Sequence, residues 1–514
     1  MPGQLRWARL AACSVWALCG SCLALNLSVP RINGDDARSL LGDGTGVIVG
    51  IVDSGVDFSH PFLAGNDSLG NPRLAAIGNF VPTEPGNAGE DVFGHGTAVA
   101  GVVLGNDAAY RGIATDARYI SARGLDANNS FSTDAWVINA MGFALANRAD
   151  VINLSISYNS TTTTGSTRLA LMSDWASYAL GVPVVGITHN DFSNAASPMR
   201  AGGDGYNMIT AAASASNAYD QVALFSRIGP TTDGRCKPDI TAPGQSITTA
   251  NANWETQADY NSWSGTSFAA PHIAGLLASQ IEFGRANGLS TNPLVLKSTL
   301  LNSAEKIRDR TGGAWEPNAY TSSPALLSVT SPLDTHAGAG QANGLALYEQ
   351  YRAGRHGPGS VPAIGWDLNT IAGISSLDYL LMESPRIGTI FAATLTWFRH
   401  VNRTDNGNGV IDEFDLFTQA EALDNLDLQV LRDGVPVAQS ISTRDNVEHL
   451  YFTVVEPGAY SIRVNRLNVA GSGSDELYSL AWRTTPVPEP AMPALAALAT
   501  LAMQRRSRSA FRRP

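Results

Sequence analysis

The sequence predicts an α/β protein, in which a mainly parallel sheet lies between two helical layers, followed by a small all-β sandwich. Up to about residue 347, short apolar runs of strand length alternate with helix-like stretches of small residues. Strands that are apolar on both faces and alternate with helices are typical of a parallel sheet that is covered on both sides. Farther along the chain, strand-like runs follow one another between turn residues, which is typical of a sandwich.

Each expected element has its own local signal. Residues 46–52 (GVIVGIV) predict the first strand of the parallel sheet, and a carboxylate follows directly. Residues 352–362 (RAGRHGPGSVP) are rich in Gly, Pro and Arg and predict a linker to the sandwich. We expect further parallel strands at 151–155, 182–187 and 208–213, helices at 133–148 and 267–282, and sandwich strands at 389–397, 426–431, 449–454 and 459–464.

The composition indicates a folded, acidic protein. Hydrophobic residues make up 44% of the 514 residues and charged residues only 15%. The formal net charge is −11, and only three lysines occur. Because no basic patch is visible that could neutralise phosphates, we expect no binding to nucleic acid.

The N-terminus is typical of a secretory signal peptide covering residues 1–24. Arg6 and Arg9 precede an apolar stretch at residues 10–23, and the small residue Ala24 closes a suitable cleavage site. A buried N-terminal helix is the alternative. Removal of the signal would leave Cys236 as the single cysteine, so the mature protein could form no internal disulfide.

Three motifs carry the side chains needed for acyl transfer. Asp53 ends an apolar run and precedes a Ser-Gly turn, His95 lies in Gly-His-Gly-Thr-Ala-Val-Ala-Gly, and Ser267 lies in Ser-Gly-Thr-Ser-Phe-Ala-Ala-Pro-His-Ile-Ala-Gly. A serine hydroxyl needs a histidine to take its proton, and a buried carboxylate must orient that histidine. A helix starting at Ser267 would add N–H groups beside the developing oxyanion. Taken singly, the three residues could equally be a strand-end cap, a core histidine and a helix cap.

Together, and in the order Asp, His, Ser, the motifs resemble those of the subtilase (subtilisin-like) serine peptidases. Residues 237–244 (KPDITAPG) and 338–343 (GAGQAN) resemble further stretches of that family. The resemblance implies a subtilisin-like three-layer catalytic domain, which we place at residues 25–355. It implies Asp53, His95 and Ser267 as the catalytic triad, a protein or peptide substrate, and no cofactor for the chemistry.

The resemblance also implies an oxyanion donor and a substrate-binding strand. Asn190 matches the family's oxyanion asparagine, although His189 replaces the usual glycine before it; an ordinary loop asparagine is the alternative. Loss of such a donor lowers turnover by about 10²–10³. The residues expected to bind substrate as an added strand are Leu154, Ser155, Ile156 and Ser157, the last in place of a frequent glycine.

The expected activity is that of an exported, monomeric serine endopeptidase. Two alternatives stay open: an exopeptidase on the same fold, and a catalytically inactive surface protein that binds partners through its sandwich. The intact triad argues against the inactive protein. No pro-domain is expected between the predicted cleavage site and Asp53, so folding would be unaided or assisted by another protein.

The sandwich is expected at residues 356–484 and contains an acidic segment at residues 404–415 (TDNGNGVIDEFD). Its spacing is similar to that of an EF-hand calcium loop, although a threonine replaces the first acidic ligand. Two interpretations of this segment stay open: a loop that binds structural calcium and an ordinary solvated loop. The candidate ligands are Asn406, Asn408, Asp412 and Asp415.

Residues 487–514 resemble the PEP-CTERM sorting signal of exported bacterial proteins. Val-Pro-Glu-Pro precedes an apolar run at residues 491–503, and five arginines follow at residues 505–513. The resemblance implies a transient membrane anchor that a sorting peptidase of the exosortase type processes, with release or retention at the cell envelope. A disordered tail is the alternative.

Overall fold

The computed structural model describes residues 25–86, 88–216, 219–314, 320–323, 326–469 and 475–485. The predicted signal peptide at 1–24 and the predicted sorting segment at 487–514 lie outside the described residues. Among the helices within them, none is both long enough and apolar enough to cross a membrane.

A seven-stranded sheet forms the centre of the N-terminal part, and every neighbouring pair of its strands is parallel. This confirms the predicted fold class. Its strands are short and almost wholly apolar, because both faces of the sheet are covered. In spatial order they are β2 (Leu74–Asn79), β3 (Arg118–Arg123), β1 (Ile48–Asp53), β4 (Val151–Leu154), β5 (Val184–Ile187), β6 (Ile209–Ser214) and β7 (Ile240–Pro243).

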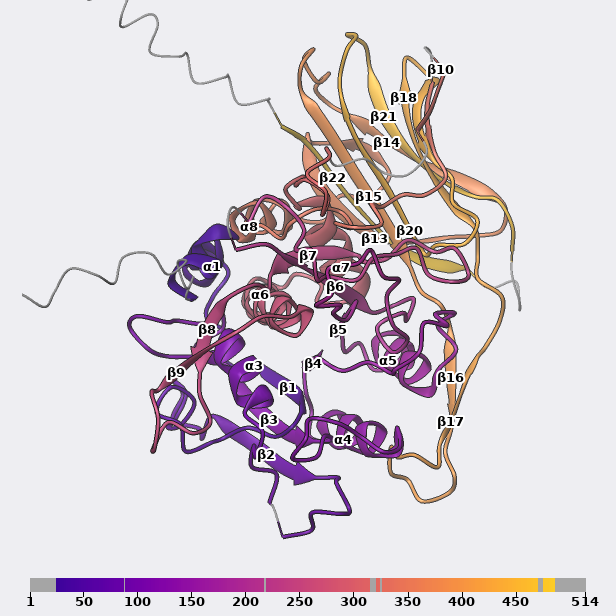
Figure 1. Ribbon diagram of the computed structural model, residues 1–514. Coiled ribbons are helices and arrows are strands. Elements are labelled where there is room, and N and C mark those ends of the chain that lie inside the picture. Colours follow the sequence, from indigo (N-terminus) through magenta and orange to yellow (C-terminus); the bar gives the residue numbers. More distant parts are fainter. Residues whose placement is uncertain are drawn as a thin grey trace, which may run out of the picture.

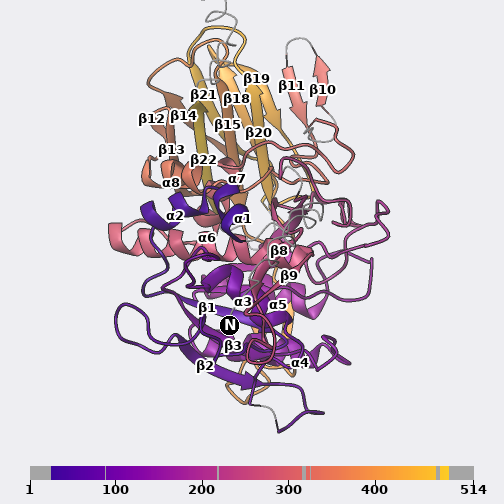
Figure 2. The same ribbon diagram turned by 60° about the vertical axis from the view of Figure 1, so that its left-hand side comes forward.

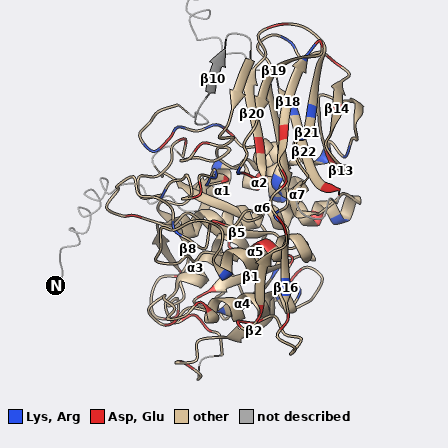
Figure 3. Ribbon diagram, turned by 90° about the vertical axis from the view of Figure 1, so that its right-hand side faces the viewer, with Lys and Arg blue, Asp and Glu red and all other residues tan. Residues whose placement is uncertain are grey.

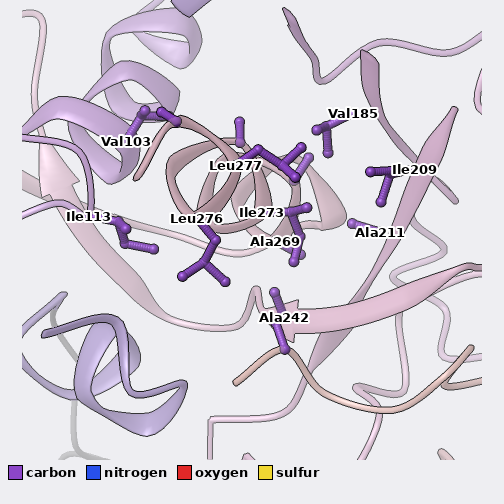
Figure 4. Close-up of a cluster of buried hydrophobic side chains, with 14 of the residues drawn as sticks. Val103, Ile113, Val185, Ile209, Ala211, Ala242, Ala269, Ile273, Leu276 and Leu277 are labelled. Carbon is purple, nitrogen blue, oxygen red and sulfur yellow. The ribbon is translucent and has the colours of Figure 1, made fainter. Parts of the chain in front are cut away.

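Two helical layers cover the sheet (Figure 1). The helices α4 (Ala135–Ala146) and α5 (Arg168–Ala179) pack on one face, and α3 (His95–Leu104) and α6 (Thr266–Asn287) pack on the other. α6 is the central helix of the second layer: its Ala269, Ile273 and Leu277 face strand residues such as Val185 and Ile209 (Figure 4). It ends at a glycine with φ 65°, a conformation that glycine adopts without strain.

Smaller elements complete the N-terminal part. The hairpin of β8 (Ile247–Ala250) and β9 (Tyr260–Trp263) packs on α3 and leads directly into α6. α1 (Leu25–Arg31) and α2 (Gly34–Leu40) pack near α6 and α8 (Gly344–Arg352), as Figure 2 shows. Ser28 of α1 lies 3.0 Å from Nε2 of His272, so the first described helix is joined to the helix that carries Ser267.

The C-terminal part is the predicted sandwich, with two antiparallel-rich sheets around an apolar core. Acidic and basic residues are scattered over its strands among many more uncharged residues (Figure 3). α7 (Pro293–Asn302) and α8 pack against the sheet that contains β22, which joins the two parts. One sheet has the order β10 (Tyr320–Ser323), β11 (Leu326–Val329), β19 (Val435–Ser440), β18 (Leu426–Arg432), β21 (Tyr460–Arg466), β14 (Ser375–Leu381) and β12 (Gly359–Val361); the other has the order β13 (Ile364–Ile371), β22 (Glu476–Thr485), β15 (Ile390–Trp397) and β20 (Val447–Thr453).

The two parts are interleaved in the chain. β11 precedes the expected boundary at residue 355, yet it pairs with β19 of the sandwich. The segment 352–362, expected as a linker, contains β12 and is held by an ion pair between Arg355 and Asp367. A hairpin of β16 (Val401–Thr404) and β17 (Leu416–Gln419) extends from the sandwich along α5 (Figure 1). The division at 355 therefore stays a prediction about folding units.

Candidate active site

Asp53 and His95 form a buried hydrogen-bonded pair at the carboxyl end of the sheet. Asp53 is the last residue of β1, and its side chain is fully buried. His95 is the first residue of α3, after Gly94, whose φ of 100° favours glycine. Nδ1 of His95 lies 2.6 Å from Oδ1 of Asp53. The carboxylate therefore orients the imidazole and leaves Nε2 on the opposite edge of the ring.

Carboxylates raise the pKa of His95 above its usual 6.5. Burial favours the neutral ring, but the charge and hydrogen bond of Asp53, together with the charge of Asp91, outweigh it. Asp91 accepts hydrogen bonds from the backbone N–H groups of Gly94 (2.7 Å) and Thr97 (2.8 Å). It is thus a capping carboxylate for α3 that also acts on the histidine, and the sequence motifs did not single it out.

Ser267 is the second residue of α6 and lines the same cleft as His95. The ring of the next residue, Phe268, lies 5.6 Å from the imidazole. Pro271 has no N–H for the carbonyl of Ser267 four residues earlier, and this carbonyl accepts a hydrogen bond from Oγ of Ser155 at 3.0 Å instead. The proline of the serine motif thereby allows the segment after β4 to form a hydrogen bond with the start of α6.

Asn190 lies three residues after β5 and contacts the same helix end. Its Oδ1 accepts hydrogen bonds from the backbone N–H (2.8 Å) and the hydroxyl (3.1 Å) of Thr266. Both bonds orient the amide, and Nδ2 donates to no acceptor among the described residues. A donor at the N-terminus of a helix is suited to binding a negatively charged oxygen.

His189 adopts a backbone conformation that glycine favours, with φ 77°. Its ring bonds to the backbone of the next residue: Nδ1 lies 2.6 Å from the amide nitrogen of Asn190 and 2.9 Å from its carbonyl oxygen. Burial is the main cause that lowers the pKa of His189, so the ring is neutral near pH 7. His189 thus stands where the family usually has glycine, and the contacts of its ring with Asn190 stabilise this backbone conformation.

One cleft of about 490 Å³ brings most of the predicted residues together. His95, Ser267 and Asn190 line it, and Asp53 lies behind His95. Of the four residues expected to bind substrate, Ser155, Ile156 and Ser157 line the cleft. The side chain of Leu154 does not, because the alternation along β4 directs it into the core beneath α4 and α5.

Aromatic residues that sequence reasoning missed surround the histidine. The ring of Trp263 lies 6.2 Å from that of His95 and 5.7 Å from that of Phe268. Phe93 contacts the same tryptophan at 6.3 Å, and all three aromatic residues line the cleft. Their positions beside the His and Ser motifs were the available signal. They shield one side of the imidazole from water.

The four candidate calcium ligands lie in the loop between β16 and β17, which contacts α4 and contributes no residue to the lining of the cleft (Figure 1). Asn406 and Asn408 donate hydrogen bonds to Asp412, and Arg403 pairs with Asp415 at 2.6 Å. Within the described ranges, no group of three or more His, Cys, Asp or Glu side chains is arranged to hold a metal ion. Calcium binding stays a prediction.

Comparison with known proteins gives a consistent family. The profile of peptidase S8, the subtilase family, matches residues 44–334. The chain is 35% identical over 237 residues to subtilisin NAT of Bacillus subtilis subsp. natto, covering 46% of this chain and 55% of that protein. It is 30% identical over 276 residues to a thermophilic serine proteinase of Bacillus sp. (strain AK1), covering 53% and 60%.

A third relative is an extracellular serine proteinase of Thermus sp. (strain Rt41A), 31% identical over 297 residues, with 56% of this chain and 63% of that protein covered. The chain thus spans little more than half the length of these curated relatives. The family profile nevertheless covers more than half of the chain and all three motifs. By this match, the protein belongs to the subtilase family.

Proposed function

We propose that the protein is a serine endopeptidase that hydrolyses peptide bonds of proteins. One observation carries the proposal: the pair of Asp53 and His95, 2.6 Å apart, lies in the same cleft as Ser267 at a helix N-terminus. The names of the relatives, all serine proteinases or subtilisins, support the same class. A cleft lined by the segment after β4 also suits an extended peptide, which can pair with backbone groups there.

In the proposed reaction, Ser267 attacks the scissile carbonyl and transfers its proton to Nε2 of His95. Asp53 holds the imidazole in the required tautomer and stabilises its charged form. Nδ2 of Asn190 and the N–H groups at the start of α6 bind the oxyanion. His95 then donates its proton to the leaving amine, and water releases the acyl group by the reverse sequence. No cofactor takes part in these steps.

The decisive test compares the full chain with Ser267→Ala for fluorophosphonate labelling and for cleavage of unfolded casein. We expect labelling and cleavage only in the unmutated protein. Ser130→Ala is the matched control, because Ser130 lines the same cleft and should not affect labelling. A folded wild type that neither labels nor cleaves would favour the inactive surface protein, and products shortened only from one end would favour the exopeptidase.

We also propose that the protein is exported from a bacterial cell as a monomer and carries a sorting tail. The signal-like residues 1–24, the Pro-Glu-Pro tail and a relative named as extracellular support export. Cell fractionation with mass spectrometry of both termini tests it: an intact precursor found only in the cytoplasm would contradict it. Thermal unfolding with and without EDTA tests structural calcium at residues 404–415.

A further inference from the structure

The segment 200–203 does not line the cleft itself, but it packs between the two walls that do. A Cβ added to Gly202 would lie 3.3 Å from Cα of Ser157, on one wall. A Cβ added to Gly203 would lie 2.0 Å from the carbonyl oxygen of Ile187, on the other. The backbone N–H of Arg200 donates to the carbonyl of Thr188 at 3.3 Å. The segment is therefore wedged between the strand ends that carry Ser157 and Asn190.

The side chain of Arg200 lies next to one wall of the cleft. Its Nη1 donates to Oδ1 of Asn159, which lines the cleft. Its charge acts on His189 on the opposite wall: after burial, Arg200 and Arg227 are the charges that lower the pKa of that histidine. A guanidinium keeps its charge over the whole pH range in which proteins fold.

No carboxylate neutralises Arg200 within the described part of the chain, where it forms no ion pair. Asp191, on the same wall as Asn190, is already bound by Arg227 at 3.5 Å and by the hydroxyl of Ser193 at 2.6 Å. Nε of Arg200 is buried without a hydrogen-bond partner. The arginine is therefore available to an incoming anion through the rest of its guanidinium.

A second polar atom belongs to the wall residue against which Gly202 packs. Oγ of Ser157 is buried and makes no hydrogen bond with any described residue. The walls of the same cleft also carry the apolar side chains of Ile156 and Ile187. The surroundings fit a side chain with a short aliphatic stem and an anionic tip, because the stem meets apolar walls and the tip meets a cation and a hydroxyl.

We propose that Arg200 makes this cleft select substrates with a glutamate or aspartate as the residue that contributes the scissile carbonyl. This inference rests on the proposed peptidase function and narrows its substrate class. Ser155, which bonds to the carbonyl of Ser267, and Asn190 place the walls next to the attacked carbonyl. The side chain of that substrate residue is the one that would extend between the walls toward Ser157 and Arg200.

The test uses the full chain and three peptides that differ only at this residue: Glu, its neutral isostere Gln, and Phe. We expect kcat/KM for Glu to exceed that for Gln by about tenfold or more, since a charge-assisted hydrogen bond is gained. The ratio should approach one in Arg200→Gln and stay well above one in Arg200→Lys, which keeps the charge. It should also fall with rising salt. Arg308→Gln, an exposed arginine outside the cleft, should keep the wild-type ratio.

Equal kcat/KM for Glu and Gln in the wild type, with cleavage and fluorophosphonate labelling intact, would overturn the inference and leave the proposed function standing. A preference for Glu that persists in Arg200→Gln would assign the selectivity to another residue and also overturn it. If no peptide is cleaved and Ser267 is not labelled, the proposed function fails, and this inference fails with it.

Discussion

Replacing Asp91 by Asn tests how the capping carboxylate controls the histidine. Oδ1 of Asp91 accepts hydrogen bonds from Gly94 N–H at 2.7 Å and from Oγ of Ser54 at 2.9 Å, while Oδ2 accepts from Thr97 N–H at 2.8 Å. Ser54 in turn accepts from Gly96 N–H at 2.9 Å. One carboxylate thus joins the turn after the Asp motif to the first turn of the His helix.

The expected change in the free energy of unfolding follows from these contacts. An asparagine keeps one acceptor oxygen, so the Thr97 N–H would face an amide nitrogen and lose its partner, at a cost of about 1–3 kcal/mol. Loss of the negative charge at the start of α3 adds about 0.3–1 kcal/mol. Burial raises the pKa of Asp91, so relief of that unfavourable burial offsets part of the loss. We expect the free energy of unfolding to fall by about 1–3 kcal/mol.

The assay is the pH dependence of kcat/KM together with urea unfolding. Because His95 must be neutral to accept a proton and its pKa is raised, wild-type activity should rise with pH through a value above 6.5. Asp91→Asn removes a negative charge that raises this pKa, so the rise should move to lower pH. Asp107→Asn is the matched control, since Asp107 also accepts two backbone hydrogen bonds but is not among the charges that act on His95. An unmoved or upward-shifted rise in Asp91→Asn would refute the reasoning.

Three further predictions follow from the site and from a histidine of the C-terminal part. Asn190→Ala should lower kcat by about 10²–10³ with little change in KM, because in the proposed reaction its Nδ2 binds the oxyanion and not the ground-state substrate. Gly96→Ala should lower kcat/KM by about 10–100-fold without altering any triad member, because misplacing a catalytic group is costly; its Cβ would lie 2.0 Å from the carbonyl oxygen of Gly55 and 3.1 Å from Cβ of Asp53. The third concerns His400: burial opposes its charge, but hydrogen bonds and charges of Glu476 and Glu421 raise its pKa to about 9. Since the folded pKa exceeds the usual 6.5, this stabilisation is complete below pH 6.5 and should be lost as pH rises through about 9, by at most about 3 kcal/mol.

Each of these has a distinct contradicting result. If KM of Asn190→Ala rises by the same factor by which kcat falls, Asn190 has a role in substrate binding. Unchanged fluorophosphonate labelling by Gly96→Ala would show that α3 can shift without moving His95. For His400, urea unfolding between pH 6 and 10 should show the decline in wild type and not in His400→Gln; the same decline in both would assign it to other groups.

The sequence predicted catalytic residues best where they lie within short continuous motifs. Asp53, His95 and Ser267 each lie at the end of a strand or the start of a helix, and such ends are visible in apolar patterning. Asp53 and Asn190 follow strands of the parallel sheet, whose carboxyl ends meet at one edge. The family resemblance, and not the fold class, singled out Asn190. The short apolar runs likewise predicted β1, β4, β5 and β6 to within about two residues at each end.

Only the tertiary structure decided which side chains face the cleft and which segments share a sheet. Leu154 was expected with its neighbours, but the pairing of β4 with β1 and β5 fixes its side chain toward the core. Asp91 and Arg200 lie outside the motifs quoted from the sequence. Their roles come from packing against residues that lie elsewhere in the chain. β11 joins the sandwich because strand pairing satisfies backbone groups irrespective of distance along the sequence. Local pattern determines elements and their chemistry, whereas long-range contacts determine which face of each element meets the substrate.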